Sequence, residues 1–319
     1  MPLGEFDLIR RYFTRDSAQA VLGIGDDAAL LRVSSGKVLA VSTDMLVSGR
    51  HFFPDADPYL LGRKSLAVNL SDMAAMGARP RWATLALALP NVDATWLAPF
   101  ADGFFSMADE FQVELVGGDT TRGPLNICVQ IIGETDAGRA LRRDRAQVGD
   151  ILWVSGELGA AALALRHLRG EISVAQEILS RCAARLHDPS PRVALGLALQ
   201  GIARSAIDIS DGLIGDLGHI LSRSGVAADI RLADIPCHPD LKPYASQPWG
   251  RQALLAGGDD YELCFTAPAD QTDAINDISQ RLDLPLTTIG QIISGSGLTV
   301  RDADGVALNI NFKAFDHFS

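Results

Sequence analysis

The sequence predicts a protein of two α/β domains. The chain has 319 residues, of which 47% are hydrophobic, and this is enough for more than one core. Apolar segments of strand length alternate with longer helical stretches. An arginine-rich segment that begins GRALRRDR at residue 138 interrupts this alternation. We therefore expect an N-terminal domain over residues 1–138 and a C-terminal domain over residues 139–319.

The N-terminal domain should contain a sheet. Its expected strands are apolar, partly β-branched, and bounded by Gly, Pro, Asn or Asp. The run VLGIGDDAALL at residues 21–31 is interpreted as a buried strand that turns at two adjacent aspartates. The remaining strands are expected at residues 37–47, 82–90 and 126–135.

Two helices should accompany these strands. The first is expected from about Pro58 to Met76, with Asp57 as its N-cap and Gly77 at its end. Proline fits the first turn because its missing N–H has no partner there in any helix. The second helix is expected over residues 94–111.

The C-terminal domain should again mix helices and strands. A new strand begins directly after the arginine-rich segment. The expected strands cover residues 151–156, 205–212, 228–235, 261–267 and 286–293, and the expected helices cover residues 156–170, 195–203 and 211–225.

Charge and cysteine usage exclude several classes of partner. The net charge of −11 argues against a nucleic-acid backbone or an anionic membrane as partner. The four cysteines are scattered without a CxxC pair, which favours reduced thiols over disulfides or a zinc site. The N-terminal segment MPLGEFDLIRRYF lacks the apolar core of a signal peptide, and the longest apolar runs are too short to cross a bilayer. We expect a cytoplasmic protein.

Acidic residues end or interrupt apolar segments in both halves of the chain. Each Gly-Asp pair taken alone is compatible with an ordinary turn. An unpaired charge among apolar neighbours costs several kcal/mol, however, so their repetition favours a ligand. Carboxylates without neighbouring His or Cys suit a hard cation, and we expect several magnesium ions holding a polyphosphate. The residues in these segments are Asp26, Asp27, Asp44, Asp72, Asp119, Asp208, Asp211, Asp259, Asp260 and Glu262.

Asp72 lies on a helix that is largely apolar. Ser65, Asn69 and Asp72 are spaced as i, i+4 and i+7, which places them in one stripe. A solvated helix face is one interpretation. The apolar neighbours on both sides favour the other, in which little of this helix contacts water.

Common nucleotide-binding motifs are absent from the sequence. SSGK at residues 34–37 lacks the upstream glycine and the following Ser or Thr of a P-loop. GIG at residues 23–25 lacks the third glycine of a dinucleotide fingerprint, and there is no H-R-D or D-F-G pair. Any ATP site must therefore be of a less common type.

Eight longer motifs are spread almost from end to end of the chain. They are GEFDLIRRYF, GIGDDAALL, STDMLVSGRHF, AVNLSDMAAMGARP, VGGDTTRGP, SAIDISDGLIGDLGHI, GGDDYELCF and FDHF. In these motifs and in their order, the chain resembles the thiamine-monophosphate kinase family. The wider superfamily is that of aminoimidazole ribonucleotide synthetase. The resemblance implies this superfamily's two-domain fold, a homodimer formed through the N-terminal sheets, a magnesium-rich ATP site, and transfer of the γ-phosphoryl group of ATP to thiamine monophosphate.

The resemblance also implies roles for individual residues. Asp259 departs from the family pattern, which usually has the longer glutamate there. The implied metal ligands, direct or through water, are Asp27, Ser42, Thr43, Asp44, Asp72, Asp119, Asp208 and Asp211. The implied ATP contacts are Gly118, Asp119, Arg143 and Ser210, and the implied thiamine contacts are His51, Asp259 and Phe315.

The chemistry explains why the motifs contain no nucleophile and no general base. The acceptor is a phosphate monoester with a second pKa of roughly 6, so it is largely dianionic at neutral pH. Direct in-line transfer then needs positioning and charge neutralisation. Two alternatives remain open: a superfamily member with another acceptor, such as a selenophosphate synthetase-like enzyme, and a non-catalytic nucleotide- or metal-binding module.

Overall fold

A computed structural model of the protein describes residues 4–310 and separates two compact units. Unit 1 comprises Met1–Met73 and Ala78–Gly138, and unit 2 comprises Ala74–Gly77 and Arg139–Ser319. The short segment Ala74–Gly77 groups with unit 2, which binds two of its main-chain carbonyls. The N–H of Leu141 donates to the carbonyl of Met76 at 3.0 Å, and the Gln200 side chain donates to the carbonyl of Gly77.

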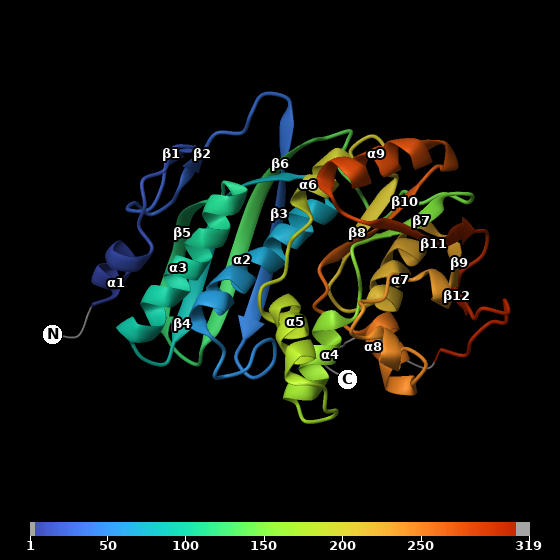
Figure 1. Cartoon of the computed structure of the whole chain (residues 1–319). Coiled ribbons are helices and arrows are strands. Elements are labelled where there is room, and N and C mark those ends of the chain that lie inside the picture. The colour runs from blue at the N-terminus through green and yellow to red at the C-terminus, as the bar shows by residue number, and fades with distance from the viewer. Residues whose placement is uncertain (1–3, 311–319) are drawn as a thin grey trace. The chain divides into compact units, whose positions relative to one another are not determined.

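Unit 1 is built on a four-stranded sheet with the strand order β3-β6-β4-β5. β6 runs antiparallel to both of its neighbours, and β4 and β5 run parallel. Helices α2 and α3 lie against one face of the sheet (Figure 1). These elements are β3 (Lys37–Val47), α2 (Pro58–Ala75), β4 (Arg79–Leu89), α3 (Ala94–Phe111), β5 (Glu114–Arg122) and β6 (Asn126–Asp136).

The sequence predictions for α2 and α3 are confirmed. The Asp57 carboxylate accepts the N–H of Leu60 at 2.9 Å, and Gly77 follows the helix with φ +60°. The two helices approach closely where Gly62 faces the main chain of α3 and Gly103 faces that of α2. A Cβ atom at either glycine would overlap a carbonyl oxygen of the other helix, so these positions fix the helix spacing.

Faces of β3 differ sharply in exposure. Even-numbered residues face α2, and odd-numbered residues face away from it, as the strand period of two requires. The outward face is apolar: Leu39 is 42% exposed, and Val41 and Met45 are each 55% exposed. An apolar sheet face of this kind is unusual on a surface that contacts only water.

The expectation of a buried strand at residues 21–31 was wrong. The segment forms two short antiparallel strands, β1 (Ala20–Leu22) and β2 (Leu30–Leu31), and Val21 is 57% exposed. Gly25 has φ +130°, a conformation that side chains rarely adopt, so the chain turns there before the two aspartates. Helix α1 (Glu5–Tyr12) precedes this hairpin.

Unit 2 contains a six-stranded mixed sheet with the order β12-β9-β11-β7-β10-β8. All neighbouring pairs are antiparallel except β9 and β12. The predicted strand at residues 228–235 is shorter than expected and continues as a 3-10 turn, Leu232–Asp234. The strands are β7 (Ile151–Ser155), β8 (Ser205–Ile209), β9 (Ala227–Arg231), β10 (Glu262–Ala267), β11 (Leu286–Ile293) and β12 (Gly297–Arg301).

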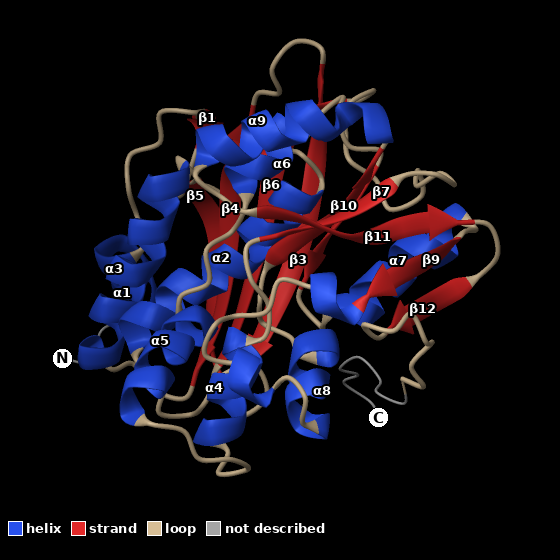
Figure 2. Cartoon of the chain, turned by 45° about the vertical axis from the view of Figure 1, so that its right-hand side comes forward, coloured by secondary structure: helices blue, strands red, loops and turns tan. Residues whose placement is uncertain are grey.

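Helices of unit 2 pack on this sheet, and most belong to one hydrophobic core. Side chains of α4, α5, α7 and α8 join inward-facing residues of the strands in that core. Figure 2 shows α7 lying behind β9 and β11. The expected helix at 195–203 is shorter and begins earlier, as α6. The helices are α4 (Ala160–Leu168), α5 (Gln176–His187), α6 (Val193–Ala198), α7 (Leu213–Ser224), α8 (Pro248–Ala256) and α9 (Thr272–Leu282).

Within residues 4–310, no helix combines the length and apolar character needed to cross a membrane.

Candidate functional site

The acids that the sequence singles out lie in both units. In unit 1, strand β3 and helix α2 bring Ser42 and Asp72 together. The Ser42 hydroxyl donates to Asp72 Oδ2 at 2.5 Å. Asp44 lies two residues along the strand and therefore on the same face as Ser42. Three of the predicted metal ligands thus share the side of the sheet that α2 covers.

Asn69 precedes Asp72 by one helical turn and is buried. Its side-chain N–H donates to the carbonyl of Ser65 at 3.1 Å, but its Oδ1 atom has no hydrogen-bond partner among the described residues. A buried acceptor without a donor is costly, and a bound water or cation would satisfy it. The second interpretation of the stripe, in which α2 is mostly dry, is confirmed, because Ser65 and Asn69 are both buried.

Thr43 points to the opposite face of β3. Its hydroxyl lies 3.4 Å from the side-chain nitrogen of Gln130 on β6, on the outward face of the sheet. A cation held by Ser42, Asp44 and Asp72 could therefore reach Thr43 only through its main-chain carbonyl.

Asp27 and Asp119 are exposed to water. Asp27 lies in the turn between β1 and β2, and its N–H donates to the carboxylate of Asp26 at 3.0 Å. Asp119 lies on β5 and pairs with Ala86 of β4. Gly118 before it has φ +153°, and a Cβ there would overlap the carbonyl of Leu85, so glycine allows the close approach of β5 to β4. Both carboxylates stay hydrated in the folded protein, so neither carries a cost of burial, and each can exchange water for a cation.

His51 follows the turn after β3. The ring atom Nδ1 of His51 accepts the main-chain N–H of Val47 at 3.0 Å. The main-chain N–H of His51 donates to the carbonyl of Val47 at the same distance. The neutral imidazole therefore carries its proton on Nε2. This pair of bonds fixes the ring relative to the end of the strand.

In unit 2, the loop between β8 and α7 carries three predicted residues. Asp208 is buried in β8, with 5% exposure, and Ser210 and Asp211 follow directly. The loop is held by Asp216, in the first turns of α7. One carboxylate oxygen of Asp216 accepts the main-chain N–H groups of Ser210, Asp211 and Gly212, each at 3.1 Å.

This arrangement limits what the start of the helix can bind. The first N–H groups of a helix often point toward a bound phosphate. Asp216 occupies the donors at 210, 211 and 212 instead. Burial raises the pKa of Asp216 to about 7, and the nearby charge of Asp211 adds to the rise, while the three N–H bonds oppose it. The main-chain N–H of Ser210 is therefore already engaged within the loop.

Arg143 is exposed and is anchored at the far end of α7. Its carbonyl accepts a hydrogen bond from the hydroxyl of Ser224, the last residue of that helix, at 2.9 Å. Ser210 precedes the first turn of the same helix. A helix of this length spans about 18 Å, so Arg143 and Ser210 cannot contact the same phosphate unless the arginine extends most of this way.

Asp259 lies beside the same loop. Its N–H donates to the carbonyl of Ser210 at 2.9 Å, and Asp259 Oδ1 lies 3.4 Å from the hydroxyl of Tyr261. The structure therefore brings together Ser210, Asp211 and Asp259, although Asp259 is 48 positions or more from the other two in the chain. Phe315 lies outside the described residues.

Two supporting groups escaped the sequence reasoning. Asp216 was not singled out, although a carboxylate in the first turns of a helix that follows a Ser-Asp-Gly turn is a recognisable capping signal. Arg192 was not singled out either, and it donates from Nε to the Glu262 carboxylate at 2.7 Å. Glu262 is 4% exposed, so this is a largely buried ion pair. No local pattern around Arg192 indicates its distant partner.

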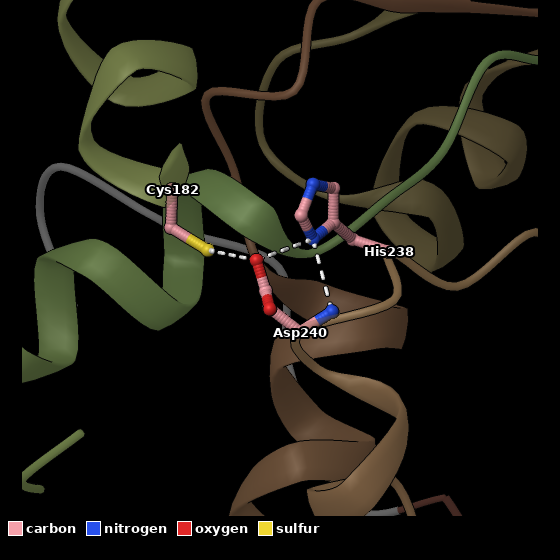
Figure 3. A group of neighbouring side chains, drawn as sticks. All are labelled: Cys182, His238 and Asp240. Atoms are coloured by element: carbon pink, nitrogen blue, oxygen red, sulfur yellow. Dashed lines mark hydrogen bonds and ion pairs between the residues drawn. The ribbon is translucent and has the colours of Figure 1, made fainter. Parts of the chain in front are cut away.

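One further cluster has the residue types of a metal site. Among the described residues, Cys182, His238 and Asp240 are the group whose ligand atoms lie within 4.8 Å of one another (Figure 3). Both oxygens of Asp240 accept from Arg181, at 2.8 and 2.6 Å, and His238 Nδ1 accepts the N–H of Asp240 at 3.3 Å. Burial raises the pKa of the Cys182 thiol to about 11, with the charge of Asp240 adding to the rise. The cluster is thus a local hydrogen-bond network with a neutral thiol, and it differs from the oxygen-rich motifs.

Comparison with known families places the chain among AIR synthase related proteins. The model of the N-terminal domain of this family matches residues 25–135, and that of its C-terminal domain matches residues 147–303. The thiamine-monophosphate kinase of Escherichia coli K12 is 45% identical over 323 residues, which cover 100% of this chain and 99% of that protein.

Solved structures agree with this assignment. The thiamine-monophosphate kinase of Stenotrophomonas maltophilia K279a is 48% identical, with a TM-score of 0.87 over 97% of this chain and 99% of that one. AaThiL, solved in complex with AMPPCP and TMP, is 32% identical, with a TM-score of 0.79 over 99% and 97% of the two chains. The chain belongs to the thiamine-monophosphate kinase family, within the AIR synthase related proteins.

Proposed function

We propose that the protein transfers the γ-phosphoryl group of ATP to thiamine monophosphate, giving thiamine diphosphate and ADP. The observation that carries this proposal is the full-length similarity to thiamine-monophosphate kinases. The AaThiL complex with AMPPCP and TMP supports the same pair of substrates. Such similarity over both units favours an enzyme of this family over a relative with another acceptor, and over a non-catalytic module.

Magnesium fits the residues that the sequence assigns to it. In unit 1, Ser42 and Asp72 are in contact, Asp44 shares their face, and the buried Oδ1 of Asn69 lacks a donor. Each of these side chains would offer a metal ion an oxygen atom, the ligand that magnesium prefers. When bound, magnesium would neutralise the phosphates and the charge that develops on them during transfer. We assign the metal ligands to Asp27, Ser42, Thr43 through its carbonyl, Asp44, Asp72, Asp119, Asp208 and Asp211.

The chain's own residues bind and orient the two substrates. Ser210 and Asp211 are presented on a loop that Asp216 holds, and Asp259 is hydrogen-bonded to that loop. We assign Ser210 to ATP, with Gly118 and Asp119 in unit 1, and Asp259 to thiamine monophosphate. His51 can donate from Nε2 to the substrate, because Nδ1 is engaged by Val47. The spacing along α7 supports contact of Arg143 with a part of ATP remote from Ser210.

Transfer needs no protein base. The acceptor phosphate is already ionised at neutral pH, so no proton must be removed before it attacks. Its oxygen forms a bond to the γ-phosphorus as the bond to the β,γ-bridging oxygen breaks, and ADP leaves. The protein contributes position and electrostatic stabilisation, which suffice for phosphoryl transfer.

A homodimer is part of the proposal. The outward face of the unit 1 sheet exposes Leu39, Val41 and Met45, and β3 is an edge strand. An apolar face on an edge strand favours association with a second copy. In Met45→Asp, light scattering should report monomers at a concentration where the wild type is dimeric. Val92→Asp, which changes an exposed residue outside the sheet, should remain dimeric. The cytoplasmic location stays a prediction.

The activity is tested by incubating the protein with ATP, magnesium and thiamine monophosphate. Mass spectrometry should detect thiamine diphosphate and ADP in equal amounts. ADP without thiamine diphosphate would point to another acceptor, and the absence of both products would contradict the proposed function.

A further inference from the structure

The segment between α8 and β10 has an unusual backbone. Within residues 4–310, non-glycine residues with positive φ are Gln112, Asp259, Tyr261 and Asp283. Gln112 and Asp283 close the C-terminal ends of α3 and α9, where a left-handed residue is common. Asp259, with φ +66°, and Tyr261, with φ +51°, close no helix, and they flank Asp260. A bulky residue such as tyrosine rarely adopts this conformation, so the surroundings must impose it.

Main-chain hydrogen bonds tie this segment to the loop that carries Ser210. The N–H of Asp259 donates to the carbonyl of Ser210 at 2.9 Å, and the N–H of Tyr261 donates to the carbonyl of Ile209 at 2.8 Å. Both left-handed residues thus use their N–H groups to reach the neighbouring strand end. Asp260 lies between these two points of attachment.

Asp260 is attached on the other side, to the start of α4. Both of its carboxylate oxygens lie 3.0 Å from the main-chain nitrogen of Gly159, the N-cap residue of that helix. A carboxylate at a helix N-terminus is favourable. Burial nevertheless raises the pKa of Asp260 well above its ordinary value, and the charges of Glu262 and Asp259 add to the rise. An acid kept in so unfavourable a place needs an explanation.

Glu262 holds the start of β10 in place. Its carboxylate accepts from Arg192 and from the hydroxyl of Ser155, and that hydroxyl accepts the N–H of Leu263 at 2.8 Å. The first residue of β10 is therefore fixed independently of Asp260. The N–H of Asp259 is bound to Ser210, and what these contacts leave to be set is the direction of the Asp259 side chain.

We propose that Asp260 is a positioning residue: by binding the N–H of Gly159, its side chain holds the left-handed backbone on either side and so sets the direction in which Asp259 meets thiamine monophosphate. Asp260 itself does not contact the substrate. The inference rests on the proposed function, in which Asp259 contacts that substrate.

The loop that carries Ser210 has its own support. Asp216 binds three consecutive N–H groups of this loop, and this contact does not involve Asp260. Loss of the Asp260 side chain should therefore loosen Asp259 and leave Ser210 in place. The KM for thiamine monophosphate should then change more than the KM for ATP.

Steady-state kinetics of Asp260→Ala and Asp260→Asn test the inference. Asp260→Ala should raise the KM for thiamine monophosphate about tenfold, the scale of one lost hydrogen bond to a charged group, and change the KM for ATP less than about twofold. Asp260→Asn keeps an oxygen that can accept the N–H of Gly159. The KM of this variant for thiamine monophosphate should therefore stay within about threefold of the wild-type value. Because asparagine replaces a disfavoured buried charge, its Tm should not fall.

Two further variants separate the possible failures. Asp229→Asn, at the Arg301 pair between β9 and β12, is the matched control and should leave both KM values unchanged. If Asp259→Ala leaves the KM for thiamine monophosphate unchanged, the substrate contact is wrong, and the inference falls with it. If Asp259→Ala is impaired but Asp260→Ala is not, the inference alone is overturned. An equal rise in the KM for thiamine monophosphate in Asp260→Ala and Asp260→Asn would also overturn the inference, because it would indicate a role for the charge itself. Equal rises in the KM values for both substrates would overturn it as well, because they would indicate a general loss of structure.

Discussion

The acids of unit 1 and those of unit 2 are held in different ways. Asp27 and Asp119 of unit 1 are exposed, one in a hairpin turn and one on β5. Asp208 and Asp216 of unit 2 are buried, with 5% and 4% exposure, and one carboxylate oxygen of Asp216 accepts three main-chain N–H groups. Exposed carboxylates can exchange water for a cation at small cost, whereas buried ones must be offset by fixed partners. We therefore expect the exposed acids of unit 1 to bind cations at the smallest cost, whereas Asp216 of unit 2 serves to shape a loop.

The difference predicts the largest loss of activity from unit 1. Asp72→Asn should keep the hydrogen bond from Ser42 but lose the charge that attracts a cation. We expect kcat to fall by about 10²–10³-fold, the scale of removing one major electrostatic contribution to the transition state. The Tm should change little. Asp102→Asn, an exposed position on α3, is the control and should retain full activity. A large drop in Tm for Asp72→Asn would show that this acid is structural, and would erase the contrast with unit 2.

The largest loss of stability should come from unit 2. Glu262→Gln leaves the guanidinium of Arg192 without its charged partner in a largely buried place. We expect the free energy of unfolding to fall by about 3 kcal/mol, as for other broken buried pairs. Urea denaturation measures this change. The partly exposed pair of Asp229 and Arg301 is the comparison, and Asp229→Asn should cost less than about 1 kcal/mol. Equal costs at the two pairs would contradict the burial argument.

How far the sequence predicts this molecule depends on the kind of segment. Strands such as β3 and helices such as α3 were predicted to the residue, because apolar pattern and end signals agree there. Helices α5 and α9 were missed although each carries a buried apolar face opposite a polar one, a pattern that is present in the sequence. Strand β5 was missed because Gly117 and Gly118 interrupt it, and there tertiary contacts decide the structure.

The candidate site is also predictable only in part. Side chains alternate between the two faces of a strand, so the sequence alone places Thr43 on the face opposite to Ser42 and Asp44. The bond between Asp260 and Gly159 joins residues 101 positions apart, and no local pattern indicates it. Sequence reasoning therefore found the acids, but it could not tell which of them face a ligand and which hold the backbone.

A smaller effect should appear with pH in unit 2. Burial lowers the pKa of His238, although the charges of Glu157 and Asp240 oppose this. Protonation is then less favourable in the folded protein than in the unfolded chain. The contribution of His238 to stability should therefore fall as pH falls through the unfolded histidine value, about 6.5, whereas that of Asp216, whose pKa is raised to about 7, should rise over the same range. Compared with the wild type, His238→Gln should shift the change in unfolding free energy between about pH 7.5 and 5.5 toward higher stability at the lower pH. A wild-type protein that gains stability over the same fall in pH, with the gain removed in the variant, would reverse the sign of this argument.

The central claim is that exposed carboxylates of unit 1 hold the cations on which phosphoryl transfer depends. The most direct test is the rate of thiamine diphosphate formation as a function of magnesium concentration, for the wild type and for Asp119→Asn. No product should form in excess EDTA, and the variant should need at least about tenfold more magnesium for half-maximal rate, the scale of a weakened metal site. An unchanged rate in EDTA, or identical magnesium curves for the two proteins, would contradict the account.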